Sequence, residues 1–115
     1  MPEEIKSIGF APNLIPLILD GSKTLTYRLG NKYTCLNIGD KIDIRDSISG
    51  EIVATAEITE KSTVLFGNLP IKRKGHEEYS SKEIQRQRFK EYYGREIEDR
   101  ELVLVFGFRI ISRRK

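Results

Sequence analysis

The sequence predicts a single domain of the α+β class, spanning residues 1–115, in which a partly closed barrel of mostly antiparallel strands carries two inserted helices. The first observation behind this prediction is length, because 115 residues have room for one hydrophobic core. The second is the apolar spacing, which alternates in short segments as it does in half-buried strands. The third is a pair of capped helical segments set between those strands.

The N-terminal part of the chain is predicted to form a strand, a short helix and a second strand. Residues 5–10 give the first strand, and the helix then covers residues 14–19 with Asn13 as its N-cap. Gly21 follows at the position where a glycine commonly ends a helix. The second strand covers residues 24–29.

The middle of the chain carries the clearest hairpin pattern. Charged and apolar side chains alternate in residues 41–45, as expected for a half-buried strand. The turn at Ser49-Gly50 leads into residues 51–59, where apolar residues again occupy every second position. We therefore expect these two segments to pair as antiparallel strands.

A second helix and a last strand complete the predicted fold. Ser80 and Glu83 have the spacing of a capping box, with Ser80 as the N-cap and Glu83 reaching back to it. The helix that they begin is predicted to end at Gly94. Residues 102–111 are apolar, β-branched and aromatic, which predicts a long buried strand.

Composition excludes several classes of protein. The N-terminus lacks the pattern of a secretory signal, and no apolar stretch approaches membrane-spanning length, so we expect a cytoplasmic protein with no membrane partner. The single cysteine, Cys35, cannot form an intramolecular disulfide and is expected to be a small apolar filler. One histidine and one cysteine do not supply the ligand spacing of a metal site, so we expect neither a metal nor another cofactor.

Basic residues cluster along the chain, although the formal net charge is only +3. Lys72, Arg73 and Lys74 form one run, and Arg86 lies among further basic residues of the second predicted helix. Such a strip can follow the phosphates of a nucleic acid, in which case binding weakens steeply with added salt. The alternative is a charged, solvated surface of the kind that many small proteins carry.

The segment after Gly21 concentrates polar side chains. Because alternate residues of a strand share a face, Thr24, Thr26 and Arg28 are predicted to lie together, with Lys23 at the start of the strand. Arg28 offers a rigid fork to a phosphate, carboxylate or carbonyl. Thr26 is a potential nucleophile, with Lys23 as its base or as an oxyanion partner. The alternative is a polar strand face that is simply exposed to water.

These residues also carry a resemblance to a known family. The pattern of Gly21, Lys23, Thr24, Thr26 and Arg28 after a short helix, with a Gly-Asp pair before the next strand, resembles that of ASCH domains. These domains are relatives of the PUA RNA-binding fold, and the resemblance covers nearly the whole chain. It implies a PUA-like fold with a polar cleft that recognises RNA or a nucleoside.

A threonine at position 26 is similar to the small bacterial ASCH proteins that act as acetylcytidine amidohydrolases. In those enzymes a lysine, a threonine and a glutamate form the implied catalytic set. The resemblance assigns these roles to Lys23, Thr26 and Glu77, with Glu78 as the close alternative to Glu77. Four further residues are expected to bind the substrate: Thr24, Arg28, Ser62 and Tyr79.

Two functions from different classes follow. In the first, the protein binds RNA or a modified nucleoside, and Tyr79 stacks on a base. In the second, it is an amidohydrolase that removes an acyl group from a modified nucleoside such as acetylcytidine, with Thr26 attacking the amide carbonyl. Ribonuclease action of the histidine-pair type is disfavoured, because the single histidine, His76, is expected to be a solvated loop residue.

Overall fold

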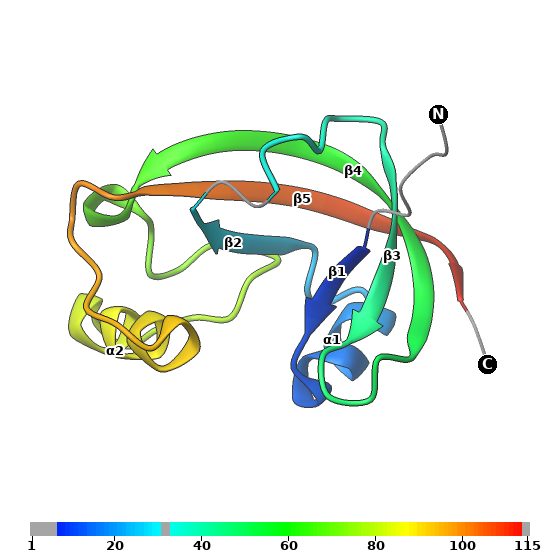
Figure 1. Cartoon of the computed structure of the whole chain (residues 1–115), viewed down its shortest axis with the longest axis horizontal. Coiled ribbons are helices and arrows are strands. Elements are labelled where there is room, and N and C mark those ends of the chain that lie inside the picture. Colours follow the sequence, from blue (N-terminus) through cyan, green and yellow to red (C-terminus); the bar gives the residue numbers. More distant parts are fainter. Residues whose placement is uncertain (1–6, 31–32, 114–115) are drawn as a thin grey trace.

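The computed structural model describes residues 7–30 and 33–113 (Figure 1). In chain order the elements are β1 (Ser7–Phe10), the 3-10 helix η1 (Pro12–Leu14), α1 (Ile15–Leu19), β2 (Leu25–Leu29), β3 (Lys41–Asp46), β4 (Ile52–Leu65), the 3-10 helix η2 (Phe66–Asn68), α2 (Lys82–Tyr93) and β5 (Leu102–Arg113). Of the first predicted strand, residues 5 and 6 lie outside the described part of the chain.

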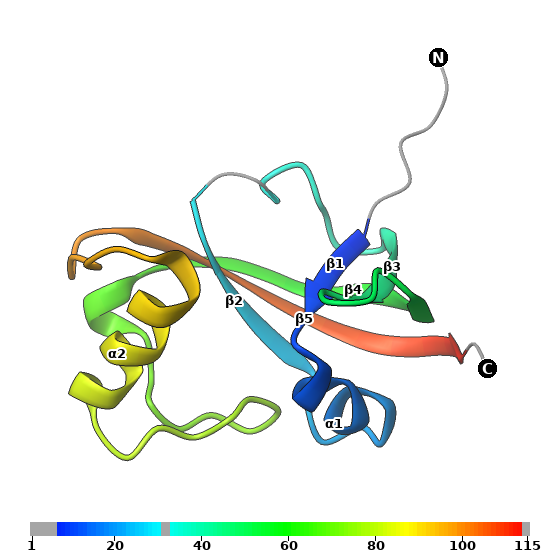
Figure 2. The ribbon, with the colours of Figure 1, turned by 60° about the horizontal axis from the view of Figure 1, so that its bottom comes forward.

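The strands form one mixed sheet in the order β1-β3-β4-β5-β2. Only β1 and β3 pair in parallel, and the other three pairs are antiparallel. The predicted α+β class and the mostly antiparallel arrangement are therefore confirmed. The sheet curves strongly but does not close, because β1 and β2 remain its two edges in the described chain (Figures 1 and 2).

β5 lies inside the sheet and contributes to two hydrophobic clusters at once. Leu104, Phe106 and Phe108 pack in the cluster that includes α1, whereas Val103 and Val105 pack in the cluster that includes Phe89 of α2. A strand that is buried on both faces needs apolar residues at nearly every position. This explains why the C-terminal apolar segment shows no alternation in the sequence, and the predicted buried strand is confirmed.

β4 is longer than the hairpin pattern predicted. Its first half pairs with β3, as expected, but the strand continues to Leu65 because β5 offers it a partner along that whole length. Ser62, which follows the predicted hairpin, therefore lies inside a strand, opposite Val105.

Both predicted N-caps are wrong. Asn13 lies inside η1, and no side chain caps either η1 or α1. In α2 the cap is Ser81, one residue after Ser80, and its hydroxyl accepts a hydrogen bond from the backbone N–H of Ile84 at 3.2 Å. With the cap at Ser81, Glu83 no longer has the spacing of a capping box. The helix ends are as predicted, since Gly21 and Gly94 follow them with φ angles of 86° and 70°.

The loop between β4 and α2 crosses under the sheet and reaches the start of β2 (Figure 2). There the carbonyl oxygen of Gly75 accepts hydrogen bonds from the backbone N–H groups of Thr24 and Leu25, at 2.7 Å and 3.0 Å. Gly75 has a φ of 92°, and a Cβ at this position would collide with the hydroxyl of Thr24. The backbone angle and the close contact both favour glycine here, and the approach brings the residues after Gly75 beside Lys23.

We expect the replacement of Ser81 by alanine to lower the free energy of unfolding by about 1 kcal/mol, because it removes the hydroxyl that caps α2. Urea unfolding followed by circular dichroism measures the change. The matched control is Ser80→Ala, since Ser80 is exposed and is not the cap of α2. The control should change stability by less than about 0.5 kcal/mol. Equal losses for the two variants would contradict the assigned cap.

Candidate functional site

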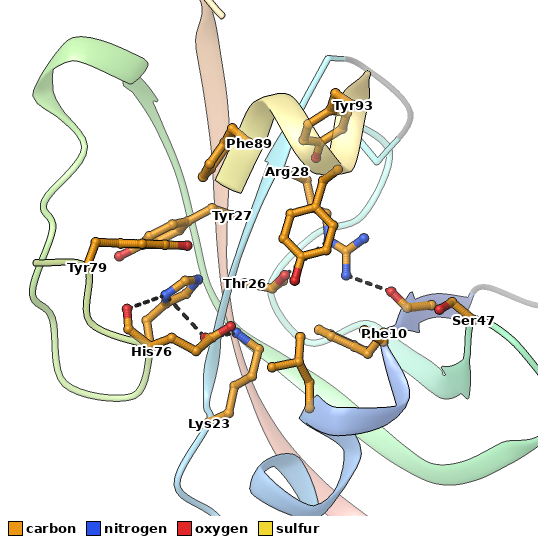
Figure 3. Close-up of a pocket in the computed structure, with 15 residues that line it drawn as sticks. Phe10, Lys23, Thr26, Tyr27, Arg28, Ser47, His76, Tyr79, Phe89 and Tyr93 are labelled. Atoms are coloured by element: carbon orange, nitrogen blue, oxygen red, sulfur yellow. Dashed lines mark hydrogen bonds and ion pairs between the residues drawn. The ribbon is translucent and has the colours of Figure 1, made fainter. Parts of the chain in front are cut away.

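A cavity of about 250 Å³ opens between the two edge strands, the loop before α2 and the C-terminal end of α2 (Figure 3). Its charged and polar lining residues come from three stretches of the chain: Lys23, Thr26, Arg28, Ser47, His76 and Glu77. Its aromatic lining residues are Phe10, Tyr27, Tyr79, Phe89, Tyr92 and Tyr93. The structure thus brings together all three residues of the predicted catalytic set.

Lys23 and Glu77 form a partly buried ion pair in this cavity, although 54 residues separate them in sequence. Nζ of Lys23 lies 2.6 Å from Oε2 of Glu77 and also donates a hydrogen bond to the carbonyl of Leu25 at 2.8 Å. Lys23 is only 4% exposed, and this burial lowers its pKa, while the neighbouring carboxylate opposes the shift. An amine in such surroundings gives up a proton more readily than a solvated lysine does.

Glu77, and not Glu78, is the carboxylate of the cavity. Burial by itself raises the pKa of Glu77, but the positive charge of Lys23 and the hydrogen bond from it outweigh burial and hold that pKa below its ordinary value. Glu77 is therefore ionised at neutral pH. Glu78 is exposed and does not line the cavity.

Thr26 and Arg28 meet on the neighbouring part of β2. Thr26 is 4% exposed, and its Oγ1 accepts a hydrogen bond from Nε of Arg28 at 3.0 Å. Because the hydroxyl accepts this bond, its own proton remains available for donation. Nη2 of Arg28 donates to the carbonyl of Gly9 in β1 at 2.8 Å, and the guanidinium lies over the rings of Phe10 and Tyr33. Arg28 thus uses two of its nitrogens within the protein, so it is less free to hold a ligand than the strand pattern predicted.

The polar face of β2 is not an ordinary water-exposed strand face. Thr26 pairs across the sheet with Phe106, on the side of the cluster that includes α1. The alternative of a solvated polar strand is therefore wrong. Two predicted substrate-binding residues nevertheless lie elsewhere, since Thr24 is exposed ahead of β2, Ser62 lies in β4, and neither lines the cavity.

His76 is a titratable residue of the cavity whose place the sequence did not predict. Its side chain is only 6% exposed, and its ring stacks on Tyr27 with 3.9 Å between ring centroids and 9° between planes. Nδ1 lies 3.0 Å from the backbone oxygen of Glu77. Burial and the nearby charge of Lys23 lower the pKa of His76 to about 4, so the ring is neutral at neutral pH. The prediction that His76 is a solvated loop residue is wrong. The one signal in the sequence that could have placed it in the cavity was its position next to Glu77.

Tyrosines form much of the remaining wall. Tyr79 follows His76 in the same loop, with 6.0 Å between the two ring centroids, and burial raises the pKa of its hydroxyl. Tyr93 of α2 accepts a hydrogen bond from the backbone N–H of Leu29 at 3.0 Å, which ties α2 to the edge of β2. Tyr92 lines the cavity while remaining well exposed, so an aromatic surface is available at the rim.

The predicted basic strip is partly engaged in internal ion pairs. Arg73 donates two hydrogen bonds to the carboxylate of Glu60, at 2.8 Å and 2.9 Å. Arg86 pairs with Asp99, on the side of α2 that contacts the following loop. The two remaining members of the strip are exposed on the loop that leads to His76: Lys72 and Lys74.

Other kinds of site receive no support from the described residues. In residues 7–30 and 33–113, no three side chains of His, Cys, Asp or Glu are grouped so that they could hold a metal ion. Neither α-helix of that part of the chain is long and apolar enough to cross a membrane. Cys35 is exposed, so its predicted role as a buried apolar filler is wrong.

Comparison with known proteins gives matches among solved structures. No protein-family model and no curated protein match the sequence. Protein EF3133 of Enterococcus faecalis V583, described as DUF984, has a TM-score of 0.74 at 16% identity, over 98% of this chain and 80% of that one. An ASCH domain of Lactobacillus crispatus JV V101 has a TM-score of 0.62 at 19% identity, and the match covers 85% of this chain and 70% of that one. A point mutant of ZmASCH from Zymomonas mobilis has a TM-score of 0.63 at 20% identity, and the match covers 90% of this chain and 67% of that one.

The chain therefore has the fold of ASCH domains, and the resemblance predicted from the segment around Lys23 is confirmed at the level of the fold. Identities of 20% or less carry no information on activity, because one fold hosts many functions. Any function of this chain must be argued from its own cavity.

The burial of a neutral His76 makes stability depend on pH. In the unfolded chain the imidazole takes up a proton near its ordinary pKa of 6.5, whereas its pKa in the folded protein is about 4. The unfolded state therefore binds more protons between these values, and stability rises with pH across that window. Lowering the pH from about 7.5 to about 5 should reduce the free energy of unfolding by about 2 kcal/mol.

Urea unfolding at the two pH values measures this loss. His76→Phe keeps an aromatic ring against Tyr27 and removes the titrating group, so the stability of this variant should change by less than about 0.5 kcal/mol over the same interval. The comparison is made within each protein, and a general loss of stability in the variant does not affect it. An undiminished pH dependence in the variant would rule out His76 as its source.

Proposed function

We propose that the chain binds a single nucleoside, free or as an unpaired nucleotide of RNA, in the cavity around Lys23 and Glu77. The observation that carries this proposal is the cavity itself, in which buried charged groups are framed by aromatic rings. A base is a flat ring with donors and acceptors along its edge, so it binds by stacking and by hydrogen bonds together. The volume of about 250 Å³ lies just below the usual range for ligand pockets and suits one nucleoside.

Each part of the lining has a role in this proposal. Tyr79 and Tyr92 offer aromatic faces for stacking. The ammonium of Lys23 has three donors, of which Leu25 and Glu77 occupy two, so one donor remains for an acceptor on the base. In RNA, the phosphates next to the bound nucleotide would meet exposed lysines of the loop that carries His76, namely Lys72 and Lys74.

A second candidate function is hydrolysis of the amide of an acylated nucleoside. The observation that favours it is the buried hydroxyl of Thr26 in the same cavity as Lys23, whose burial lowers the amine's pKa. This reaction needs Lys23 in its neutral amine form, which burial favours. Oγ1 of Thr26 attacks the carbonyl carbon while the neutral amine takes up the hydroxyl proton. The C–N bond then breaks, and the leaving amine receives that proton. Water hydrolyses the resulting ester, releases the carboxylic acid and restores Thr26.

Arg28 and Glu77 support this chemistry without taking part in bond formation. The hydrogen bond from Nε of Arg28 orients the hydroxyl of Thr26, and Glu77 holds Lys23 in place. Ribonuclease action of the histidine-pair type is not favoured by the cavity. His76 is the chain's single histidine, and with a pKa of about 4 it is a poor proton donor at neutral pH.

The binding proposal predicts that Glu77→Gln weakens cytidine binding by at least about tenfold, since it removes the charge that holds Lys23 in the cavity. Isothermal titration calorimetry with cytidine measures the affinity. Glu78→Gln is the matched control, because it makes the same change at an exposed position outside the cavity, and it should bind within about twofold of the wild type. Absence of binding by the wild-type protein to cytidine, uridine, adenosine and guanosine would refute the proposal.

The hydrolysis candidate predicts that the wild-type protein releases acetate from N4-acetylcytidine and that Thr26→Val reduces this rate by more than about a hundredfold, because the nucleophile is lost. Mass spectrometry of free cytidine follows the reaction. Thr63→Val, on an exposed part of β4, is the matched control and should keep the wild-type rate. Circular dichroism verifies that both variants fold. Undiminished hydrolysis by Thr26→Val would exclude Thr26 as the nucleophile.

A further inference from the structure

The contacts of His76 determine which of its ring nitrogens carries the proton. Nδ1 lies 3.0 Å from the backbone oxygen of Glu77 and 3.3 Å from Oε2 of the same residue. Both partners are acceptors, so Nδ1 must be the donor. In a neutral imidazole the other nitrogen, Nε2, then carries a lone pair and can only accept a hydrogen bond.

The ring is also held in one orientation and one charge state. Stacking on Tyr27, with a plane angle of 9°, restrains its rotation. Burial is the main reason that the pKa of His76 is lowered, and the charges of Lys23 and Arg28 disfavour a second proton further, whereas Glu77 favours one. The ring therefore stays neutral near pH 7. Nε2 therefore remains an acceptor under ordinary conditions.

Nε2 is available to a ligand. His76 lines the cavity, and Figure 3 shows the second ring nitrogen on the cavity side, away from the two contacts to Glu77. No hydrogen bond from the described residues reaches this nitrogen. An acceptor that a bound ligand covers gains most from a ligand that supplies a donor to it.

Lys23 and His76 together form a matched pair of hydrogen-bonding groups. Both contact the same carboxylate oxygen, since Oε2 of Glu77 lies 2.6 Å from Nζ of Lys23 and 3.3 Å from Nδ1 of His76. One carboxylate oxygen thus positions the donor Lys23 and also the ring of His76, whose other nitrogen is the acceptor. The complementary ligand edge has an acceptor next to a donor, as in the ring nitrogen and exocyclic amino group of cytosine or adenine.

We propose that Nε2 of His76 accepts a hydrogen bond from an exocyclic N–H of the bound base, and so selects amino-bearing bases over bases without that group. This inference rests on the proposed nucleoside site and names the substrate class for it. A base whose amino group carries one acyl substituent keeps one N–H and belongs to the same class. A ligand without the N–H covers this nitrogen and leaves it unpaired, which makes that ligand the weaker binder.

The test compares cytidine with the 2-pyrimidinone riboside, which differs from it by lacking the exocyclic amino group. Calorimetry with the wild-type protein should show a preference for cytidine of about tenfold. His76→Phe keeps a ring against Tyr27 but has no acceptor, so the preference should fall below about twofold. The ratio of affinities is the decisive readout, because a general disturbance of Glu77 weakens both ligands alike. A variant that keeps the tenfold preference, or a wild type that has none, overturns the inference.

A second measurement tests the tautomer without any ligand. His76 is the chain's single histidine, so its ring nitrogens are assigned without ambiguity in the ¹⁵N spectrum of the free protein. We expect the proton on Nδ1 near pH 7, and a proton on Nε2 overturns the inference even where nucleosides bind. Failure of the wild type to bind either ligand would instead overturn the proposed function on which the inference rests. Binding of both ligands with equal affinity overturns the inference alone.

Discussion

The ion pair between Lys23 and Glu77 is the interaction on which the rest of the site depends. Lys23 is almost fully buried, so its charge needs the carboxylate beside it, whereas Glu77 keeps part of its contact with water. Because the pair joins the start of β2 to the loop before α2, it fixes where that loop lies. The position of the loop in turn places His76 on Tyr27 and completes the wall of the cavity.

A second constraint comes from the open side of the sheet. β1 and β2 are its two edges in the described chain, and the side chain of Arg28 reaches from one to the other. A guanidinium therefore connects the two edges where a closed barrel would have a ladder of backbone hydrogen bonds. The gap that this leaves gives the cavity its space, and the same guanidinium orients the hydroxyl of Thr26. Arg28 therefore contributes to the fold, by joining β1 and β2, and to the site, by orienting Thr26.

The sequence predicted those parts of the structure that depend on local spacing. Alternation on β2 placed Thr26 and Arg28 on a common face, and apolar periodicity located the strands. The site also needs the loop to dock on β2, and that docking relies on backbone hydrogen bonds to Gly75, which leave no side-chain pattern. His76 looked hydrophilic for this reason, because its burial comes entirely from tertiary contacts. The continuation of β4 beyond the hairpin likewise depends on β5, a partner about 45 residues further along the chain.

Gly75 has a consequence for how this chain tolerates change. It does not line the cavity and offers no functional group, yet its positive φ and missing side chain suit the close approach of the loop to β2. A side chain at position 75 would hold the backbone in a strained conformation and force the hydroxyl of Thr24 aside, at the point where the loop is hydrogen-bonded to the strand. A substitution there would therefore act on the placement of His76 and Glu77 without changing either side chain.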